Sequence, residues 1–428
     1  MTHTDYTKEI LNLKDENIYF YENCLENISI NNCTTKVFHG YLTYTPSSCP
    51  VCGHINEGFD DIIKWAWKKN CKIKLPKIVG FNTLLLLDKQ RFFCKHCNST
   101  FTASTSIVDS HKQISHSTRT NIILDLMHKG SELDIARNNN VSTNSVNRIL
   151  HSISEDKLVK HNGYLPYSFG IDEFKATKDT ISKMAFIIID QDKKTIFDIQ
   201  NSRKSTDINK YFRRYSKRER DKVRFITMDL YKPYYKLMHQ LFRNAILIPD
   251  RFHIVIQFRN ALDKTRIQLC KKSNKNYNKF KKYWKLILKN EDDLNKSDKF
   301  YSQHFRKEVS EDYIVNYLIN TNETLKFTYN YYQGLLKSLK ARDKHAFFSI
   351  IHNAPNNLST YAKKCNHTLL NMEQYLVNAF NYELSNGIVE GTNNIIKQIK
   401  HTAYGYRKFS HLKARVMLIK GFYHPITT

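Results

Sequence analysis

Apolar residues recur along the chain with different periods in four successive regions. Up to about residue 105 they form short runs typical of strands, whereas residues 115–155 show apolar positions at helical spacing. Residues 165–250 alternate short apolar strands with polar helices, and from about 251 onward the pattern is helical, aromatic and rich in lysine. The pattern therefore predicts a multidomain α+β protein.

The third region predicts a fixed succession of strands and helices. Its first strand contains GIDEF, in which Phe169 and Ile171 alternate with Gly170 and Asp172, so the acid faces away from the apolar pair. KMAFIIID and KTIFDIQ predict two further antiparallel strands, joined by a turn at QDKK. A helix over TDINKYFRRYSKRERDKVR, the strand VRFITMDL, the helix YKPYYKLMHQLF and the strand NAILIP follow. Three strands, helix, strand, helix, strand is the order of a ribonuclease-H-like fold, which would place Asp172 and Asp229 on neighbouring strands.

The second region predicts three short helices. Gly130 is a candidate C-cap for the first, and Ser131 and either Ser142 or Thr143 are candidate N-caps for the other two. Two short helices across the tight turn NNNVS match a helix-turn-helix, although a plain three-helix bundle has the same pattern. Asn and Arg side chains can hydrogen-bond base edges in a major groove. The outward face of the third helix would carry Asn144, Ser145, Asn147 and Arg148.

Four cysteines in the first region form two Cys-x-x-Cys pairs. CPVCG contains Cys49 and Cys52, and CKHC contains Cys94 and Cys97. Four thiolates suit a tetrahedral structural zinc ion, and the strand-like runs between the pairs favour a zinc ribbon on an extended hairpin. The alternative is two reduced pairs inside a core.

Composition and the N-terminal sequence indicate what the protein binds and in which compartment it is found. The chain has 428 residues and a net charge of +27, from 67 Lys plus Arg against 40 Asp plus Glu, which points to a polyanion such as nucleic acid. A merely basic protein is the alternative. No run approaches the roughly 18 apolar residues of a spanning helix. The N-terminus has no signal-peptide pattern. We therefore expect a cytoplasmic protein that does not bind membranes.

One acid near the C-terminus stands ahead of a strongly basic stretch. Glu390 lies in LSNGIVEGTNNIIKQIKHTAYGYR, and with Asp172 and Asp229 it would form a three-carboxylate site. Such a site suits Mg²⁺, which prefers oxygen ligands. Spacing alone leaves open that Glu390 is an ordinary acid near a helix start, favoured there by the helix dipole.

Five motifs, in this order, make the chain resemble bacterial insertion-sequence transposases of the Asp-Asp-Glu type, in particular the ISL3 family: CPVCG…RFFCKHC, GIDEF, VRFITMDLYKPY, PDRFH and SNGIVEGTNNIIKQIKHTAYGYR. The resemblance covers almost the whole chain and implies that Asp172, Asp229 and Glu390 are catalytic. It also implies two Mg²⁺ or Mn²⁺ ions at the acids and a helical insertion before the Glu-bearing helix. The resemblance further implies a complete bacterial protein associated with the nucleoid. The expected partners are double-stranded DNA, both terminal inverted repeats and target DNA, and further copies of the chain on that DNA.

The resemblance divides the chain into five segments. We expect a zinc-ribbon DNA-binding domain with its N-terminal segment in 1–105, a helix-turn-helix DNA-binding domain in 106–160, the first part of the ribonuclease-H-like core in 161–253, the helical insertion in 254–380, and the last part of the core with the Glu-bearing helix and basic tail in 381–428.

Further residues have secondary expected roles. The PDRFH motif suggests that Asp250, Arg251 and His253 support the site, although Asp250 can equally cap a helix. Residues expected to contact the DNA backbone are Arg213, Arg214, Lys217, Arg218, Lys397 and Lys400. For the two lysines, a solvated helix face is the alternative. Two rival functions remain open: a non-catalytic DNA-binding regulator derived from a transposase, and a metal-dependent nuclease of the same fold.

Overall fold

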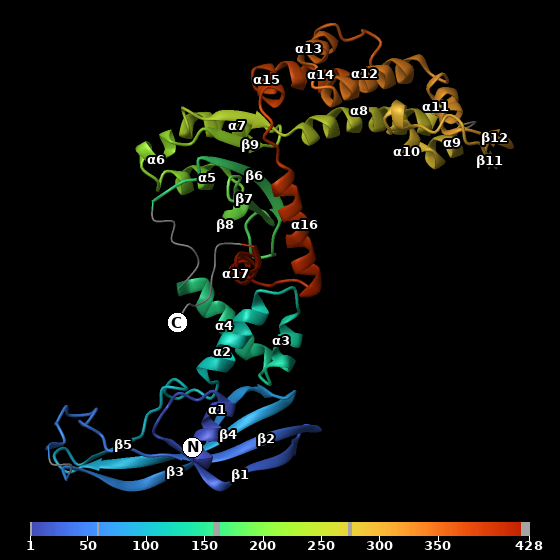
Figure 1. Ribbon diagram of the computed structural model, residues 1–428. Coiled ribbons are helices and arrows are strands. Elements are labelled where there is room, and N and C mark those ends of the chain that lie inside the picture. Colours follow the sequence, from blue (N-terminus) through green and yellow to red (C-terminus); the bar gives the residue numbers. More distant parts are fainter. Residues whose placement is uncertain (1, 58–59, 157–162, 273–275, 421–428) are drawn as a thin grey trace. The chain divides into compact units, whose positions relative to one another are not determined.

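The computed structural model describes residues 2–57, 60–156, 163–272 and 276–420, and its chain forms two compact units. The first unit comprises Met1–Lys160, Thr177–Asp179 and Ile396–Thr428, and the second comprises His161–Ala176 and Thr180–Ile395. Both units contain helices and strands (Figure 1). The predicted mixed α+β, multidomain organisation is therefore confirmed.

The first unit begins with a helix and a five-stranded sheet. Its elements are α1 (His3–Leu11), β1 (Ile18–Ile30), β2 (Cys33–Leu42), β3 (Ile62–Ile78), β4 (Phe81–Cys94) and β5 (Ser99–Thr102). The strand order is β1-β2-β4-β3, with β5 on β4, and only β2 and β4 run parallel. Strands β3 and β4 form the predicted hairpin between the two cysteine pairs. Its turn is closed by the pair Ile78–Phe81 and contains Gly80 at φ +80°, a conformation that favours glycine.

Four helices of the first unit share a hydrophobic cluster. They are α2 (His116–Leu126), α3 (Glu132–Asn138), α4 (Thr143–Asp156) and α17 (Phe409–Lys420). Ser131 accepts a hydrogen bond from Asp134 N and Ser142 accepts one from Ser145 N, so both predicted serine caps are confirmed. Buried Ala414 and Leu418 of α17 pack into the cluster of α2, α3 and α4.

The predicted C-cap at Gly130 is wrong. Helix α2 ends at Leu126, and Met127 takes the cap position. The buried guanidinium of Arg415, from α17, donates to the carbonyl oxygens of His128 and Gly130, each at 2.8 Å. These carbonyls are therefore satisfied by a distant side chain and not by a local glycine cap.

The second unit contains a sheet of five strands flanked by helices. Its elements are β6 (Ser168–Lys175), β7 (Met184–Asp190), β8 (Thr195–Gln200), α5 (Ser205–Phe212), α6 (Lys217–Asp221), β9 (Phe225–Met228), α7 (Lys232–Leu241) and β10 (Ile246–Pro249). The order is β10-β9-β6-β7-β8, in which β10, β9 and β6 are parallel and β6, β7 and β8 antiparallel. The element order matches the sequence pattern, except that one predicted helix is two. Ser216 caps α6 by accepting from Glu219 N, and buried Tyr215 separates α6 from α5.

Helices dominate the rest of the second unit. The elements are α8 (Arg251–Lys272), α9 (Tyr277–Lys282), α10 (Trp284–Ile287), the 3₁₀ turn η2 (Glu291–Asp293), β11 (Phe300–Ser302), β12 (Lys307–Val309), α11 (Glu311–Ile319), α12 (Glu323–Lys340), α13 (Lys344–His352), α14 (Thr360–Leu370), α15 (Glu373–Asn381) and α16 (Gly387–Thr402), whose last turns belong to the first unit. The prediction of an all-helical insertion is wrong for β11 and β12, which pair antiparallel. Three residues per strand are too few for a period-2 pattern to show in the sequence.

In the part of the chain that the structure describes, no helix combines the length and the apolar character needed to cross a bilayer.

Candidate functional site

Two of the predicted acids lie side by side at one end of the second unit's sheet. Asp172 is in β6, and Asp229 follows β9 directly. These strands are parallel neighbours in which Gly170 pairs with Thr227, so each acid stands two residues beyond a paired position. Because side chains alternate between faces, both acids share the face of Gly170 and Thr227, and the opposite face buries Phe169 and Ile171.

The pKa of Asp172 is raised by its surroundings. Burial of Asp172 and the nearby charge of Asp229 raise the pKa of Asp172 to about 7. A hydrogen bond from Glu173 N and the charge of His253 lower it less. A cation beside Asp172 would favour its charged form and offset the repulsion from Asp229.

A histidine and a third acid complete a tight cluster with Asp229. Asp250 follows β10, and His253 is in the first turn of α8. Nδ1 of His253 lies 2.9 Å from Asp229 Oδ1 and 2.9 Å from Asp250 Oδ2. Burial disfavours protonation of His253, but the two carboxylates outweigh it and raise the pKa of His253 to about 10. The imidazolium therefore bridges both acids at neutral pH.

The carboxylates of this cluster fit a divalent cation, and His253 could join them as a ligand only after it loses its proton. Ligand atoms of Asp229, Asp250 and His253 all lie within 4.8 Å of one another. Asp229 Oδ1 is buried and has no hydrogen bond, because its approach to His253 is an ion pair without hydrogen-bond geometry. Carboxylate oxygens are the ligands that a hard divalent cation prefers, so Asp229 and Asp250 could hold one here.

Helix α16 is fixed against the acid-bearing strands by a buried polar network. Asn386 Nδ2 donates to Ile171 O at 3.1 Å, and Asn386 Oδ1 accepts from Thr227 Oγ1 at 2.6 Å. Gln191 Nε2 donates to Thr227 Oγ1 at 2.6 Å. A Cβ atom on Gly170 would stand 2.7 Å from Val389 Cγ2 and 2.8 Å from Asn386 Oδ1. Only glycine allows this close approach of helix and strand.

The same helix brings an amide to one acid and carries Glu390. Asn393 Nδ2 donates to Asp172 Oδ2 at 2.6 Å. Glu390 lies one turn earlier on α16 and its side chain is exposed. Asp172 thus lies close enough to Asp229 and His253 for their charges to shift its pKa. Glu390 lies on the helix that contacts Asp172, but it is not part of the close group of Asp229, Asp250 and His253. Arg251, the first residue of α8, is half-buried.

Sequence reasoning did not single out Asn386, Asn393, Thr227 or Gln191. The two asparagines were visible in SNGIVEGTNN, as amides at positions −4 and +3 from Glu390 on one helix face. Thr227 and Gln191 gave no local signal, because their contacts join residues 36 and 159 positions apart.

The four cysteines of the first unit converge in a separate centre. The sulfur atoms of Cys49, Cys52, Cys94 and Cys97 all lie within 4.8 Å of one another, with Cys49–Cys97 at 3.8 Å and Cys52–Cys94 at 3.9 Å. A tetrahedron with Zn–S bonds of about 2.3 Å separates its sulfurs by about 3.8 Å, so the donors fit zinc. A hydrogen bond with Ser99 helps to lower the pKa of the Cys97 thiol to about 6, which favours the thiolate that a metal needs.

The residues expected to contact DNA lie in three parts of the chain. On α4, Asn144 and Arg148 are exposed, Asn147 is half-buried and Ser145 is buried. Around α5 and α6, the predicted contacts Arg213, Arg214, Lys217 and Arg218 are all exposed. Lys397 is exposed and Lys400 half-buried on α16.

Comparisons with known proteins identify the family. A protein of Lactococcus lactis subsp. lactis named ATP-dependent protease is 32% identical to this chain over 124 residues, which are 28% of this chain and 39% of that protein. The match thus spans about two fifths of that relative's length. The family profile of the ISL3 type of DDE transposases, described as Transposase, matches residues 169–416, which contain the sheet, the acids and α16. The chain belongs to this family of transposases.

Proposed function

We propose that this chain binds the terminal inverted repeats of an insertion sequence and carries out metal-dependent phosphodiester cleavage and strand transfer. One observation carries the proposal: Asp172 and Asp229 stand in register on parallel neighbouring strands, against a helix that carries Glu390 and donates Asn393 to Asp172. The strand order β10-β9-β6-β7-β8 supports a ribonuclease-H-like core. The 124-residue likeness to the Lactococcus protein is too short to carry that protein's named activity to this chain.

In this proposal Asp172, Asp229 and Glu390 hold Mg²⁺ or Mn²⁺, with two ions expected. Such ions stabilise both the attacking and the leaving oxygen of an in-line displacement. The protein's own groups prepare the site. Asn393 orients one oxygen of Asp172, and protonated His253 holds the carboxylates of Asp229 and Asp250 in place. Asp172 has to lose the proton that its raised pKa retains near neutrality before it can ligate.

The proposed reaction has two balanced displacements at phosphorus. In the first, a water oxygen bonds to the phosphorus at the end of the element, the bond to the 3′-oxygen breaks, and a 3′-hydroxyl and a 5′-phosphate result. In the second, that 3′-hydroxyl attacks a target phosphodiester and releases a target 3′-hydroxyl. In the second step one phosphodiester bond forms for each that breaks. Strand transfer therefore requires no energy from a nucleoside triphosphate.

Sequence-specific DNA recognition is assigned to the first unit, and backbone contacts to both units. We propose that α2, α3 and α4 act as a helix-turn-helix and that the four-cysteine centre is a structural zinc ribbon. The exposed cations around α5 and α6, and Lys397 and Lys400, are proposed to contact the DNA backbone, in agreement with the net charge of +27. The proposed assembly is a homo-oligomer on paired DNA ends.

The test compares the wild-type chain with Asp229→Asn and Glu390→Gln on labelled duplex that carries the DNA flanking the coding region. Glu383→Gln is the matched control, since Glu383 is an exposed acid seven residues before Glu390 that pairs with Arg342 at 2.7 Å. We expect wild type and Glu383→Gln to nick the repeat boundary with Mg²⁺, and the two site variants to bind without cutting. Joined products would exclude a nuclease. Binding without cutting by the wild type would favour the regulator, and normal cutting by Glu390→Gln would remove Glu390 from the site.

A further inference from the structure

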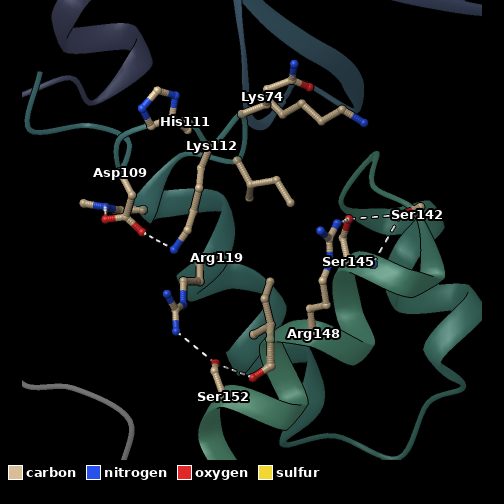
Figure 2. Close-up of a pocket in the computed structure, with 13 residues that line it drawn as sticks. Lys74, Asp109, His111, Lys112, Arg119, Ser142, Ser145, Arg148 and Ser152 are labelled. Atoms are coloured by element: carbon tan, nitrogen blue, oxygen red, sulfur yellow. Dashed lines mark hydrogen bonds and ion pairs between the residues drawn. The ribbon is translucent and has the colours of Figure 1, made fainter. Parts of the chain in front are cut away.

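A basic pocket lies in the first unit beside α4. It has a volume of about 520 Å³ and is bounded by the chain around Asp109–His116, by α2, by α4 and by Lys74 of β3 (Figure 2). The contribution of α4 comes from successive turns, through Ser142, Ser145, Arg148 and Ser152. The pocket therefore follows the helix that we propose to enter DNA.

The lining of the pocket is strongly positive. Lys74, Lys112, Arg119 and Arg148 face a single carboxylate, Asp109, which leaves a net charge of three positive with neutral histidines. Asp109 is already paired with Lys112 at 2.7 Å and His116 at 2.9 Å, and these partners lower the pKa of Asp109 to about 2. Both oxygens of Asp109 therefore already have a partner. The two arginines have no carboxylate partner among the lining residues.

Both guanidinium groups are held by serine hydroxyls. Arg119 Nη2 donates to Ser152 Oγ at 3.1 Å, and Ser152 Oγ in turn donates to Ile149 O at 2.8 Å. Arg148 Nη2 donates to Ser145 Oγ at 3.2 Å, and Ser145 Oγ lies 3.0 Å from Ser142 Oγ. Each guanidinium uses one of its five N–H groups in this way, and its fork keeps further donors for an oxyanion.

Lys74 has a different part in the pocket. Its Nζ donates to Asn140 O, in the turn between α3 and α4, at 2.7 Å. Its backbone accepts from Ser115 N at 3.1 Å and from Thr118 Oγ1 at 3.0 Å. Lys74 therefore joins the β-sheet to the three helices and fixes the walls of the pocket, while Arg119 and Arg148 supply the free donors.

We propose that this pocket holds one backbone phosphate of duplex DNA between Arg119 and Arg148. The inference rests on the proposed function and makes it more specific. A phosphate held beside the first turns of α4 would fix the position of that helix on the duplex, because phosphate contacts set register while base contacts set sequence preference. Arg148, expected from the sequence to read bases, becomes a backbone contact, and exposed Asn144 remains the candidate base reader.

The experiment measures DNA affinity of the full-length chain by fluorescence anisotropy at several salt concentrations. Two duplexes of equal length are used, one with the flanking repeat and one of unrelated sequence. The variants are Arg119→Gln, Arg148→Gln and Asn144→Ala, and thermal unfolding checks that each is folded. Arg342→Gln is the charge-matched control, because it removes an exposed arginine of the second unit that pairs with Glu383.

We expect Arg119→Gln and Arg148→Gln to weaken binding to both duplexes by the same factor, about tenfold. Each should also reduce the slope of log affinity against log salt by about one. Asn144→Ala should weaken binding to the repeat alone, and Arg342→Gln should change neither slope.

Other outcomes overturn the inference. If Arg148→Gln weakens only the repeat complex, Arg148 reads bases. If Arg119→Gln leaves both affinities and the slope unchanged, or if Arg342→Gln has the same effect, no phosphate is held in the pocket. A wild-type chain that binds the two duplexes equally contradicts the proposed repeat recognition. If the wild-type chain shows the expected salt slopes but does not cut the repeat duplex, only the catalytic proposal is contradicted.

Discussion

Replacement of Gly170 by alanine should separate the strand that carries Asp172 from the helix that carries Glu390. The added Cβ would stand 2.7 Å from Val389 Cγ2, 2.8 Å from Asn386 Oδ1 and 2.9 Å from Thr227 Oγ1, all closer than real Cβ contacts. Overpacking of this kind costs about 1–3 kcal/mol. Displacing Asn386 would also weaken its buried hydrogen bonds to Ile171 O and Thr227, at about 1 kcal/mol each.

Gly170→Ala should therefore reduce the free energy of unfolding of the second unit by about 2–5 kcal/mol. It should also abolish DNA cleavage while DNA binding by the first unit is retained. The assays are urea unfolding, cleavage of the flanking DNA and anisotropy. Gly391→Ala is the stability control, since nothing lies within 4 Å of its added Cβ on α16, and alanine should stabilise that helix by up to about 1 kcal/mol. Equal stability and activity of Gly170→Ala and wild type would refute the close-approach argument.

Three further predictions follow from the pKa, metal and packing observations. In metal-free protein, the folded state keeps the proton of Asp172 up to about pH 7, while the unfolded chain releases it near its ordinary value of 3.8. Stability should thus fall between these pH values, by up to about 1.4 kcal/mol per pH unit, and Asp172→Asn should remove that slope in urea unfolding at graded pH. Cys94→Ser, or a strong chelator, should release one zinc ion per chain and lower the melting temperature of the first unit, measured by metal analysis and calorimetry; a melt unchanged by chelation would exclude a structural zinc. Arg415→Met should leave the carbonyls of His128 and Gly130 without their buried donor and destabilise the first unit by about 2–4 kcal/mol, and an unaltered melt would contradict this role.

Local sequence signals were sufficient for much of the architecture. The apolar runs of the second unit predicted the succession of its strands along the chain, because a buried strand can be recognised within five or six residues. They also predicted that Asp172 lies on the first of these strands and that Asp229 follows the fourth. The cysteine spacing and the runs between the pairs likewise predicted the β3–β4 hairpin and the grouping of four sulfurs. In each case the residues that carry the signal also make the contact.

Long-range contacts left no such signal. The parallel pairing of β2 with β4 skips β3, which precedes β4 in the chain, and nothing in either strand's alternation indicates that choice of neighbour. The predicted C-terminal segment 381–428 was assigned as a whole to the catalytic core, but α17 packs against α2 and α4, and Ile396–Thr428 belongs to the first unit. A helix such as FSHLKARVMLIK shows that it will be buried, but its sequence does not show against which partner.

Arg415 explains why that partner could not be identified from the helix itself. Arginine amid Ala414, Val416 and Met417 would ordinarily argue against a buried face, since an unpaired buried cation is strongly unfavourable. In the structure, Arg415 donates to the carbonyl oxygens of residues 128 and 130, which lie 287 and 285 positions earlier in the chain. These carbonyls follow the end of α2, where the helix no longer supplies donors. Nη2 of Arg415 thus gains two acceptors, and the nearby charges of Glu132 and Asp125 also favour the buried cation. The C-terminal helix is therefore specific for the three-helix cluster, and removal of α17 should impair DNA binding as well as stability.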